Sequence, residues 1–177
     1  MSEWLSDYAV PSYTPTLVAL LNARRTQRSI STSELVPLLV AEPFAPSLPK
    51  IENVVDEVQT VAKVLAACSP IIVGPLTQDS PGSSVSAVLD ALSSTALLHL
   101  ACHGQQDPHH PLQSGFRLRD GTLSVADLMR LQLPNALFAF LSACETAKGD
   151  KRQPDQAVHL AAAMLFVGFR SVVATMW

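Results

Sequence analysis

The chain has 177 residues, of which 48% are hydrophobic and 15% are charged, so it can bury a core and does not have the composition of a disordered polymer. Its formal net charge is −3, which excludes a nucleic-acid binder whose affinity comes from a broad basic face. The most apolar stretch, residues 157–177, is interrupted by His159 and Arg170, so we expect no membrane span.

Apolar periodicity and turn residues predict strands that alternate with helices. Thr14 and Pro15 mark the first helix, as an N-cap followed by proline, and this helix is expected to end within residues 24–28. The other expected helices cover residues 51–65, 84–92, 124–131 and 156–166. The expected strands cover residues 35–41, 71–73, 96–102, 136–143 and 171–177, with a hairpin over residues 116–123 that turns at Asp120 and Gly121.

This alternation predicts an α/β fold with a mostly parallel sheet flanked by helices. The strands at residues 96–102 and 136–143 are apolar on both faces, as buried parallel strands are. No internal repeat, linker or low-complexity segment interrupts the chain. We therefore expect a single domain over residues 1–177, with residues 1–33 as an N-terminal helical segment of that domain.

A histidine and a cysteine follow two of these apolar strands. His103 and Gly104 come directly after residues 96–102, and Cys144 comes directly after residues 136–143. Ligands bind at the carboxyl ends of parallel strands, so these side chains can meet there. A thiolate is a strong nucleophile, and a histidine near its ordinary pKa accepts a proton near neutrality. His103 and Cys144 are therefore candidates for a catalytic base and nucleophile.

Other groups near these two residues can complete an active site. A developing oxyanion needs N–H donors, and the backbone N–H groups of Gly104 and Cys144 are the candidates. Ser142 and Asp155 are the candidates for a substrate pocket. Asp155 can receive a basic substrate side chain, or it can cap the next helix. No third side chain that orients His103 is evident, and a backbone carbonyl can serve that purpose.

A purely structural interpretation stays open at this point. Cys144 can be a packed core thiol and His103 a turn residue, because free cysteine is among the most buried residue types. Cys102 is expected to be such a thiol, since strand alternation points it away from the face of His99 and His103. The three cysteines lack motif spacing, which suits a reducing compartment. The N-terminus lacks a secretory pattern, so we expect a cytoplasmic protein.

A metal site is the other alternative. Potential zinc ligands crowd one short stretch, at Cys102, His103, Asp107, His109 and His110. Adjacent histidines in a proline-flanked loop rarely converge on one ion, so this loop is expected to lie exposed beside the cleft. We expect neither a metal nor a cofactor.

The motifs around these residues resemble those of the CHAT domain, a caspase-like module often found beside tetratricopeptide (TPR) repeats. The matching segments are LHLACHG at residues 98–104, PLQS at 111–114, LSVADL at 123–128, LSACET at 141–146 and GFRSVVATMW at 168–177. The resemblance covers nearly the whole chain. It implies a caspase-like three-layer sandwich in which His103 corresponds to the general base and Cys144 to the nucleophile.

The sequence departs from the family pattern in two ways. Ala147 stands where many members have glycine. Family members also continue past the strand equivalent to residues 171–177, so the resemblance implies a sheet that is incomplete at its C-terminal edge. An uncovered edge strand would invite pairing with a second chain.

We therefore predict a cysteine endopeptidase of the caspase-like (CHAT) type, which acts on a polypeptide through a His–Cys dyad and an acyl-enzyme intermediate. The alternative is a catalytically inactive caspase-like interaction module, with a TPR-type repeat domain or a second chain as its partner. Neither a nucleic acid nor a membrane is expected as a partner.

Overall fold

A five-stranded parallel sheet forms the centre of the fold. The computed structural model describes residues 4, 8, 14, 16–18, 20–21, 31, 35–76, 80–107, 109–143 and 160–174. The sheet has the strand order β2-β1-β3-β7-β8, and each neighbouring pair runs parallel. Its strands are β1 (Pro37–Ala41), β2 (Ile71–Val73), β3 (Leu97–Ala101), β7 (Phe138–Ser142) and β8 (Ser171–Ala174). The predicted α/β class with a mostly parallel sheet is confirmed.

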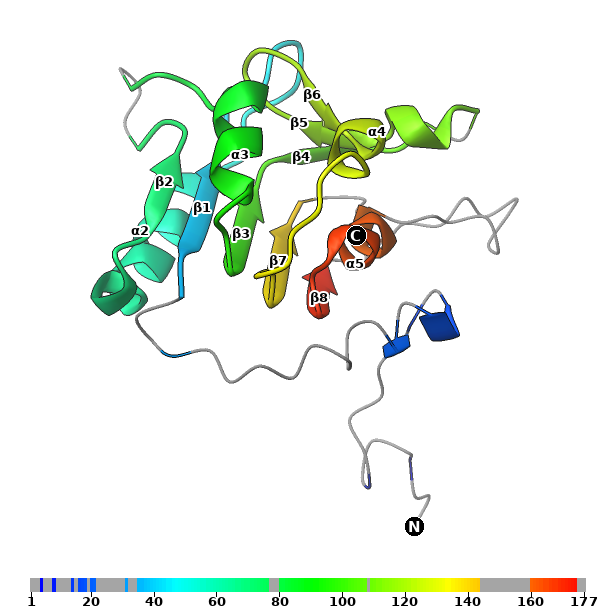
Figure 1. Cartoon of the computed structure of the whole chain (residues 1–177). Coiled ribbons are helices and arrows are strands. Elements are labelled where there is room, and N and C mark those ends of the chain that lie inside the picture. Colours follow the sequence, from blue (N-terminus) through cyan, green and yellow to red (C-terminus); the bar gives the residue numbers. More distant parts are fainter. Residues whose placement is uncertain are drawn as a thin grey trace.

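Helices cover both faces of this sheet and give the fold three layers (Figure 1). One face packs against α2 (Val54–Val64), and the other against α3 (Val85–Leu92) and α5 (Leu160–Val167). A short 3-10 helix, η3 (Ala66–Cys68), joins α2 to β2. No helix in the described ranges is long and apolar enough to cross a membrane.

The two faces of β1 belong to two different cores. Leu38 and Val40 belong to the core that also contains residues of α3 and α5, whereas Leu39 and Ala41 belong to the core that contains residues of α2. Successive residues of a strand point to opposite faces, and both faces of this sheet are covered, so all four side chains are buried. Burial on both sides explains why this strand is a continuous apolar run rather than an alternating one.

A second, antiparallel sheet caps one end of the first. Its strands are β4 (His103–Gln105), β5 (Gly115–Arg117) and β6 (Thr122–Ser124), in the order β4-β5-β6. The hairpin that turns at Asp120 and Gly121 is confirmed. The strand β4 and the 3-10 helix η4 (Pro111–Gln113) were not predicted, since residues 105–114 were expected to be a polar loop.

The short helix α4 (Val125–Leu128) follows β6 directly. The Ser124 hydroxyl accepts a hydrogen bond from the backbone N–H of Asp127 at 3.1 Å. The Asp127 carboxylate accepts one from the backbone N–H of Ser124 at 3.2 Å. This reciprocal capping box satisfies two N–H groups at the helix start, and it confirms the predicted cap at Ser124.

The predicted helices at the two ends of the chain are described only in part. Leu17, Val18, Leu20 and Leu21 are helical, in agreement with the expected first helix, while the other residues of that helix fall largely outside the described ranges. Inclusion of residues 1–33 in the domain stays a prediction. The last helix, α5, ends at Val167 and is followed by Gly168 with φ of 127°, a positive value that glycine commonly adopts after a helix C-terminus.

Gly74 allows β2 to end close against β1. Its φ is 114°, and a Cβ at this position would overlap the carbonyl oxygen of Ala41. We expect Gly74→Ala to lower the free energy of unfolding by about 2–4 kcal/mol, because it adds backbone strain to a backbone clash.

Gly121→Ala is the matched control for denaturant unfolding. A Cβ at Gly121 meets only the Val85 side chain, at 3.7 Å, which is ordinary contact. This variant should unfold within about 1 kcal/mol of the wild type. Equal losses in the two glycine variants would contradict the close approach of Gly74 to Ala41.

Candidate active site

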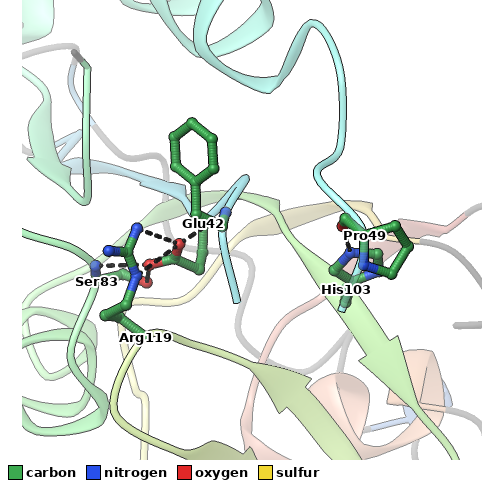
Figure 2. Close-up of polar contacts among 6 residues, drawn as sticks. Glu42, Pro49, Ser83, His103 and Arg119 are labelled. Carbon is green, nitrogen blue, oxygen red and sulfur yellow. Dashed lines mark hydrogen bonds and ion pairs between the residues drawn. The ribbon is translucent and has the colours of Figure 1, made fainter. Parts of the chain in front are cut away.

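His103 lies where the two sheets meet. The strand β3 ends at Ala101, Cys102 links the sheets, and His103 begins β4. The Nε2 atom of His103 lies 2.7 Å from the carbonyl oxygen of Pro49 (Figure 2). A carbonyl oxygen can only accept, so Nε2 must carry the hydrogen in this bond. In the neutral ring Nδ1 is then unprotonated and can accept a proton.

The carbonyl of Pro49 belongs to a loop that is closed by its own backbone. The N–H of Ile51 donates to the carbonyl of Pro43 at 3.1 Å, which closes the base of the loop. Within it, the N–H of Leu48 donates to the carbonyl of Ala45 at 3.2 Å. The carbonyl that orients His103 is therefore held in a hydrogen-bonded turn rather than in an open segment.

The backbone N–H of Gly104 points to the open edge of β4. Antiparallel pairs alternate between hydrogen-bonded and non-hydrogen-bonded positions. The N–H of Leu118 donates to Gly121, and the N–H of Val125 donates to Ser114, so the backbone of Phe116 faces β6. Gly104 stands opposite Phe116 and therefore occupies a non-hydrogen-bonded pair with β5. Its N–H is directed away from the hairpin.

Cys102 is a core thiol, as predicted. It is fully buried among the apolar side chains of the larger core, and burial raises the pKa of its thiol well above the usual range, with a smaller contribution from the charge of Glu42. A thiol in this environment is a poor nucleophile, because the thiolate is the reactive form.

Two of the other polar candidates, Cys144 and Asp155, lie outside the described residues. The structure describes the strand that leads to Cys144, which ends at Ser142 and is followed by the buried Ala143. This strand β7 is the direct neighbour of β3, and Ser142 stands opposite Ala101 in the parallel register. The ends of the two strands are therefore level.

Ser142 lies on the face of the sheet that packs against α2, near Glu57. Glu57 Oε1 also lies 2.9 Å from Nε2 of the buried His99, whose ring stacks on Phe140 at 5.3 Å between centroids. Nε2 of His99 makes no hydrogen bond with a described residue, so its contact with Glu57 is a close approach rather than a hydrogen bond. Assignment of Ser142 to a substrate pocket stays a prediction.

The same face of the sheet holds a cavity of about 440 Å³. Most of its wall is apolar, and Glu57 and His99 supply its polar groups. It is lined by Leu39, Glu57, Val61, Leu65, Leu97, Leu98, His99, Phe138 and Phe140. His103 is not among these described lining residues.

The loop after β4 is organised by Asp107. Its Oδ1 accepts hydrogen bonds from the backbone N–H groups of His109 and His110, each at 2.9 Å, and these bonds, that of His110 foremost, lower the pKa of this carboxyl. Nδ1 of His110 lies 3.4 Å from the other carboxylate oxygen. Among the described side chains no three potential ligands converge as a metal cluster.

Comparison with known families agrees with the motifs. The sequence matches the family model of the CHAT domain over residues 2–177. The chain belongs to the CHAT domain family. The parallel sheet between two layers of helices in this CHAT domain is the caspase-like arrangement that the resemblance implied. No curated protein matches the sequence.

The group that orients His103 in this CHAT domain was not identified from the sequence. A carbonyl was expected in general terms, but every residue carries one, so no side chain marks Pro49 as the partner. The position of Pro49, 54 residues before His103, gives no local signal either. Only the path of the loop after β1 reveals this contact.

The contact of Glu57 with His99 predicts a stability change in acid. This contact, foremost, and the Ser142 hydroxyl lower the pKa of Glu57, although burial opposes them. A carboxyl with a lowered folded-state pKa stabilises the fold above its unfolded pKa of about 4.3, and the contribution is lost as the pH falls through the folded value. We expect Glu57→Gln to be less stable than the wild type at pH 7, with a gap that closes below about pH 4.

Glu52→Gln is the control for these unfolding curves. Glu52 pairs with Lys50 at 2.9 Å, but its side chain is 72% exposed, and exposed ion pairs contribute little. Its curve should follow the wild type throughout. A Glu57→Gln gap that stays constant or widens in acid would contradict the lowered pKa.

Proposed function

We propose that this CHAT domain is a cysteine endopeptidase with His103 as base and Cys144 as nucleophile. The register between β3 and β7 is the observation that supports the proposal best. Ala101 stands opposite Ser142, and His103 and Cys144 each follow these paired residues by two positions. Neighbouring strands lie about 4.8 Å apart, so level strand ends favour an approach of the two side chains.

The contact of His103 with Pro49 supports the assignment of the base. Its hydrogen-bonded Nε2 leaves Nδ1 as the proton acceptor toward Cys144. The carbonyl also stabilises the imidazolium, because it accepts the Nε2 hydrogen in both charge states. A thiolate–imidazolium pair is then favoured over the neutral pair.

Peptide cleavage would follow in two stages. The Cys144 thiolate attacks the scissile carbonyl carbon and forms a C–S bond, and the carbonyl oxygen takes the negative charge. The intermediate collapses as the C–N bond breaks, and the His103 imidazolium gives its proton to the leaving amine. Water, deprotonated by His103, then attacks the thioester, and the C–S bond breaks to return the thiolate.

The oxyanion would be stabilised by backbone N–H groups. Gly104 fits this role because its N–H is directed away from β5, and because glycine places no side chain in the way. The second donor would be the N–H of Cys144.

We also propose the cytoplasm as the location, since the free Cys68 and Cys102 suit a reducing compartment.

Cys144→Ala should abolish peptide cleavage. With a broad peptide library and mass-spectrometric detection, we expect turnover to fall by at least about 10³-fold, because loss of the nucleophile removes the covalent route. Cys68→Ala replaces another free, partly buried thiol and should retain wild-type turnover. Equal turnover by Cys144→Ala and the wild type would refute the assignment.

The second candidate is an interaction module without catalysis, which would bind a second chain or a TPR-type repeat domain. It is favoured by the strand β8, which among the described strands pairs with β7 alone and leaves Val173 46% exposed. Phe138 and Phe140 lie partly exposed on the neighbouring strand. An open edge of this kind can accept a strand from another polypeptide.

The rate of thiol alkylation separates the two candidates. For a peptidase, iodoacetamide should modify Cys144 near pH 7 on the order of tenfold faster in the wild type than in His103→Ala, because His103 raises the thiolate fraction. The buried Cys102 is an internal reference that should react slowly in both proteins. Equal Cys144 rates would remove the support for catalysis and favour the interaction module.

A further inference from the structure

A buried carboxylate, Glu42, lies at the end of β1 and is connected to His103 only through other residues. Glu42 follows β1 directly and is fully buried. Its Oε1 accepts hydrogen bonds from the N–H of Phe44 at 2.9 Å and from Nε and Nη2 of Arg119 at 3.3 and 3.0 Å. Its Oε2 accepts them from the N–H and the hydroxyl of Ser83, at 3.0 and 2.9 Å (Figure 2). A buried carboxylate with this many donors is held in one position.

The hydrogen bond from the N–H of Phe44 connects Glu42 to the loop that carries Pro49. The N–H of Phe44 lies in the first turn of this loop, and the carbonyl of Pro43 closes its base with Ile51. The backbone N–H of Glu42 itself donates to the carbonyl of Ala101 at 2.9 Å, two residues before His103. Glu42 therefore fixes the start of the loop against the strand that leads to His103.

The bonds from Arg119 reach His103 from the other side. Arg119 lies in the hairpin between β5 and β6, and Arg117 of β5 stands opposite His103 in the antiparallel register. The ion pair with Glu42 thus ties the hairpin that carries the partner of β4 to the loop that carries Pro49. A closed path of hydrogen bonds and backbone therefore joins these elements. It runs from Glu42 through the loop to Pro49 and His103, and from β4 through its partner β5 and Arg119 back to Glu42.

Ser83 has a different position in this arrangement. It is buried and donates twice to the same carboxylate, but it belongs to the segment before α3, which carries neither Pro49 nor the partner strand of β4. Its carbonyl also accepts a hydrogen bond from the N–H of Arg119 at 3.0 Å, and this backbone bond would persist in a Ser83→Ala variant. Loss of the Ser83 hydroxyl therefore removes a donor to Oε2 and leaves the three donors to Oε1 in place.

We propose that Glu42 is a positioning residue for His103. It holds the Pro49 loop and the β4–β5 pair in place, so that the Pro49 carbonyl stays within hydrogen-bond distance of Nε2. The hydrogen then stays on Nε2, and Nδ1 is left to accept a proton. The proposal rests on the role of His103 as the base. Its direct readout is the tautomer of the ring, which can be measured without peptidase activity.

The test measures the imidazole ¹⁵N chemical shifts of His103 in the Cys144→Ala chain at about pH 8, where histidine is mostly neutral. Without further substitution, we expect the tautomer with hydrogen on Nε2 to dominate. In Glu42→Gln, an amide N–H₂ faces donors that need an acceptor, so the ratio of Nε2-H to Nδ1-H tautomers should fall about fivefold.

Ser83→Ala is the matched control, because it removes a buried hydroxyl from the same carboxylate. It should lose stability without a change in the tautomer ratio of His103. If Glu42→Gln does not fold, Arg119→Met replaces it, since this variant removes the guanidinium but keeps most of the side-chain stem. Arg119→Met should lower the ratio while Ser83→Ala does not.

Two results would overturn the positioning role. One is an unchanged tautomer ratio in a folded Glu42→Gln or Arg119→Met chain. The other is a fall in Ser83→Ala as large as that in Glu42→Gln, which would make the change a general loss of structure. The cleavage and alkylation assays test the peptidase separately, so a failure of one claim is distinguishable from a failure of the other.

Discussion

The parallel pairing of β3 with β7 is the constraint on which the account depends. Its register sets Ala101 opposite Ser142 and brings the ends of two strands level at one edge of the sheet. A slip by one residue would turn every side chain of a strand to the opposite face, and the two faces of this sheet pack against different helices. The two buried cores therefore fix the register, and the register fixes where the residues after each strand emerge.

The orientation of the His103 imidazole needs a further interaction, because its place after β3 does not by itself determine how the ring is turned. His103 is the first residue of β4, and its ring is turned by the hydrogen bond from Nε2 to Pro49. The loop that carries this carbonyl starts at Glu42, whose buried carboxylate also binds the hairpin through Arg119. The chain thus uses a buried carboxylate at one end of β1, paired with a partly exposed arginine, to order a polar group at the end of β3.

Elements with strong apolar patterns were predictable from the sequence. The strands β1, β3 and β7, the helices α2 and α3, and the hairpin of β5 and β6 all lie within a few residues of their expected positions. The strand β4 was missed because it has only three residues, two of them polar and one glycine, and it gains its partners from the distant β5. Its order comes from tertiary pairing rather than from local preference.

The candidate site was predictable only where a side chain identifies its role. His103 stood out because it follows an apolar strand, and the buried state of Cys102 followed from strand alternation. The Pro49 carbonyl has no side-chain signature, and nothing in the sequence around Glu42 indicated a part in the site. Cys144 and Asp155 lie outside the described residues, so their roles rest on the sequence and on the register of β3 with β7.

Cross-linking with 1,3-dibromoacetone tests the central claim most directly, because its three-carbon bridge joins only side chains that nearly touch. We expect the reagent to link Cys144 Sγ to His103, and peptide mass spectrometry to locate the bridge at Nδ1, the nitrogen that Pro49 leaves free. Cys144 that is alkylated without any bridge to His103, in a folded wild-type chain, would contradict it.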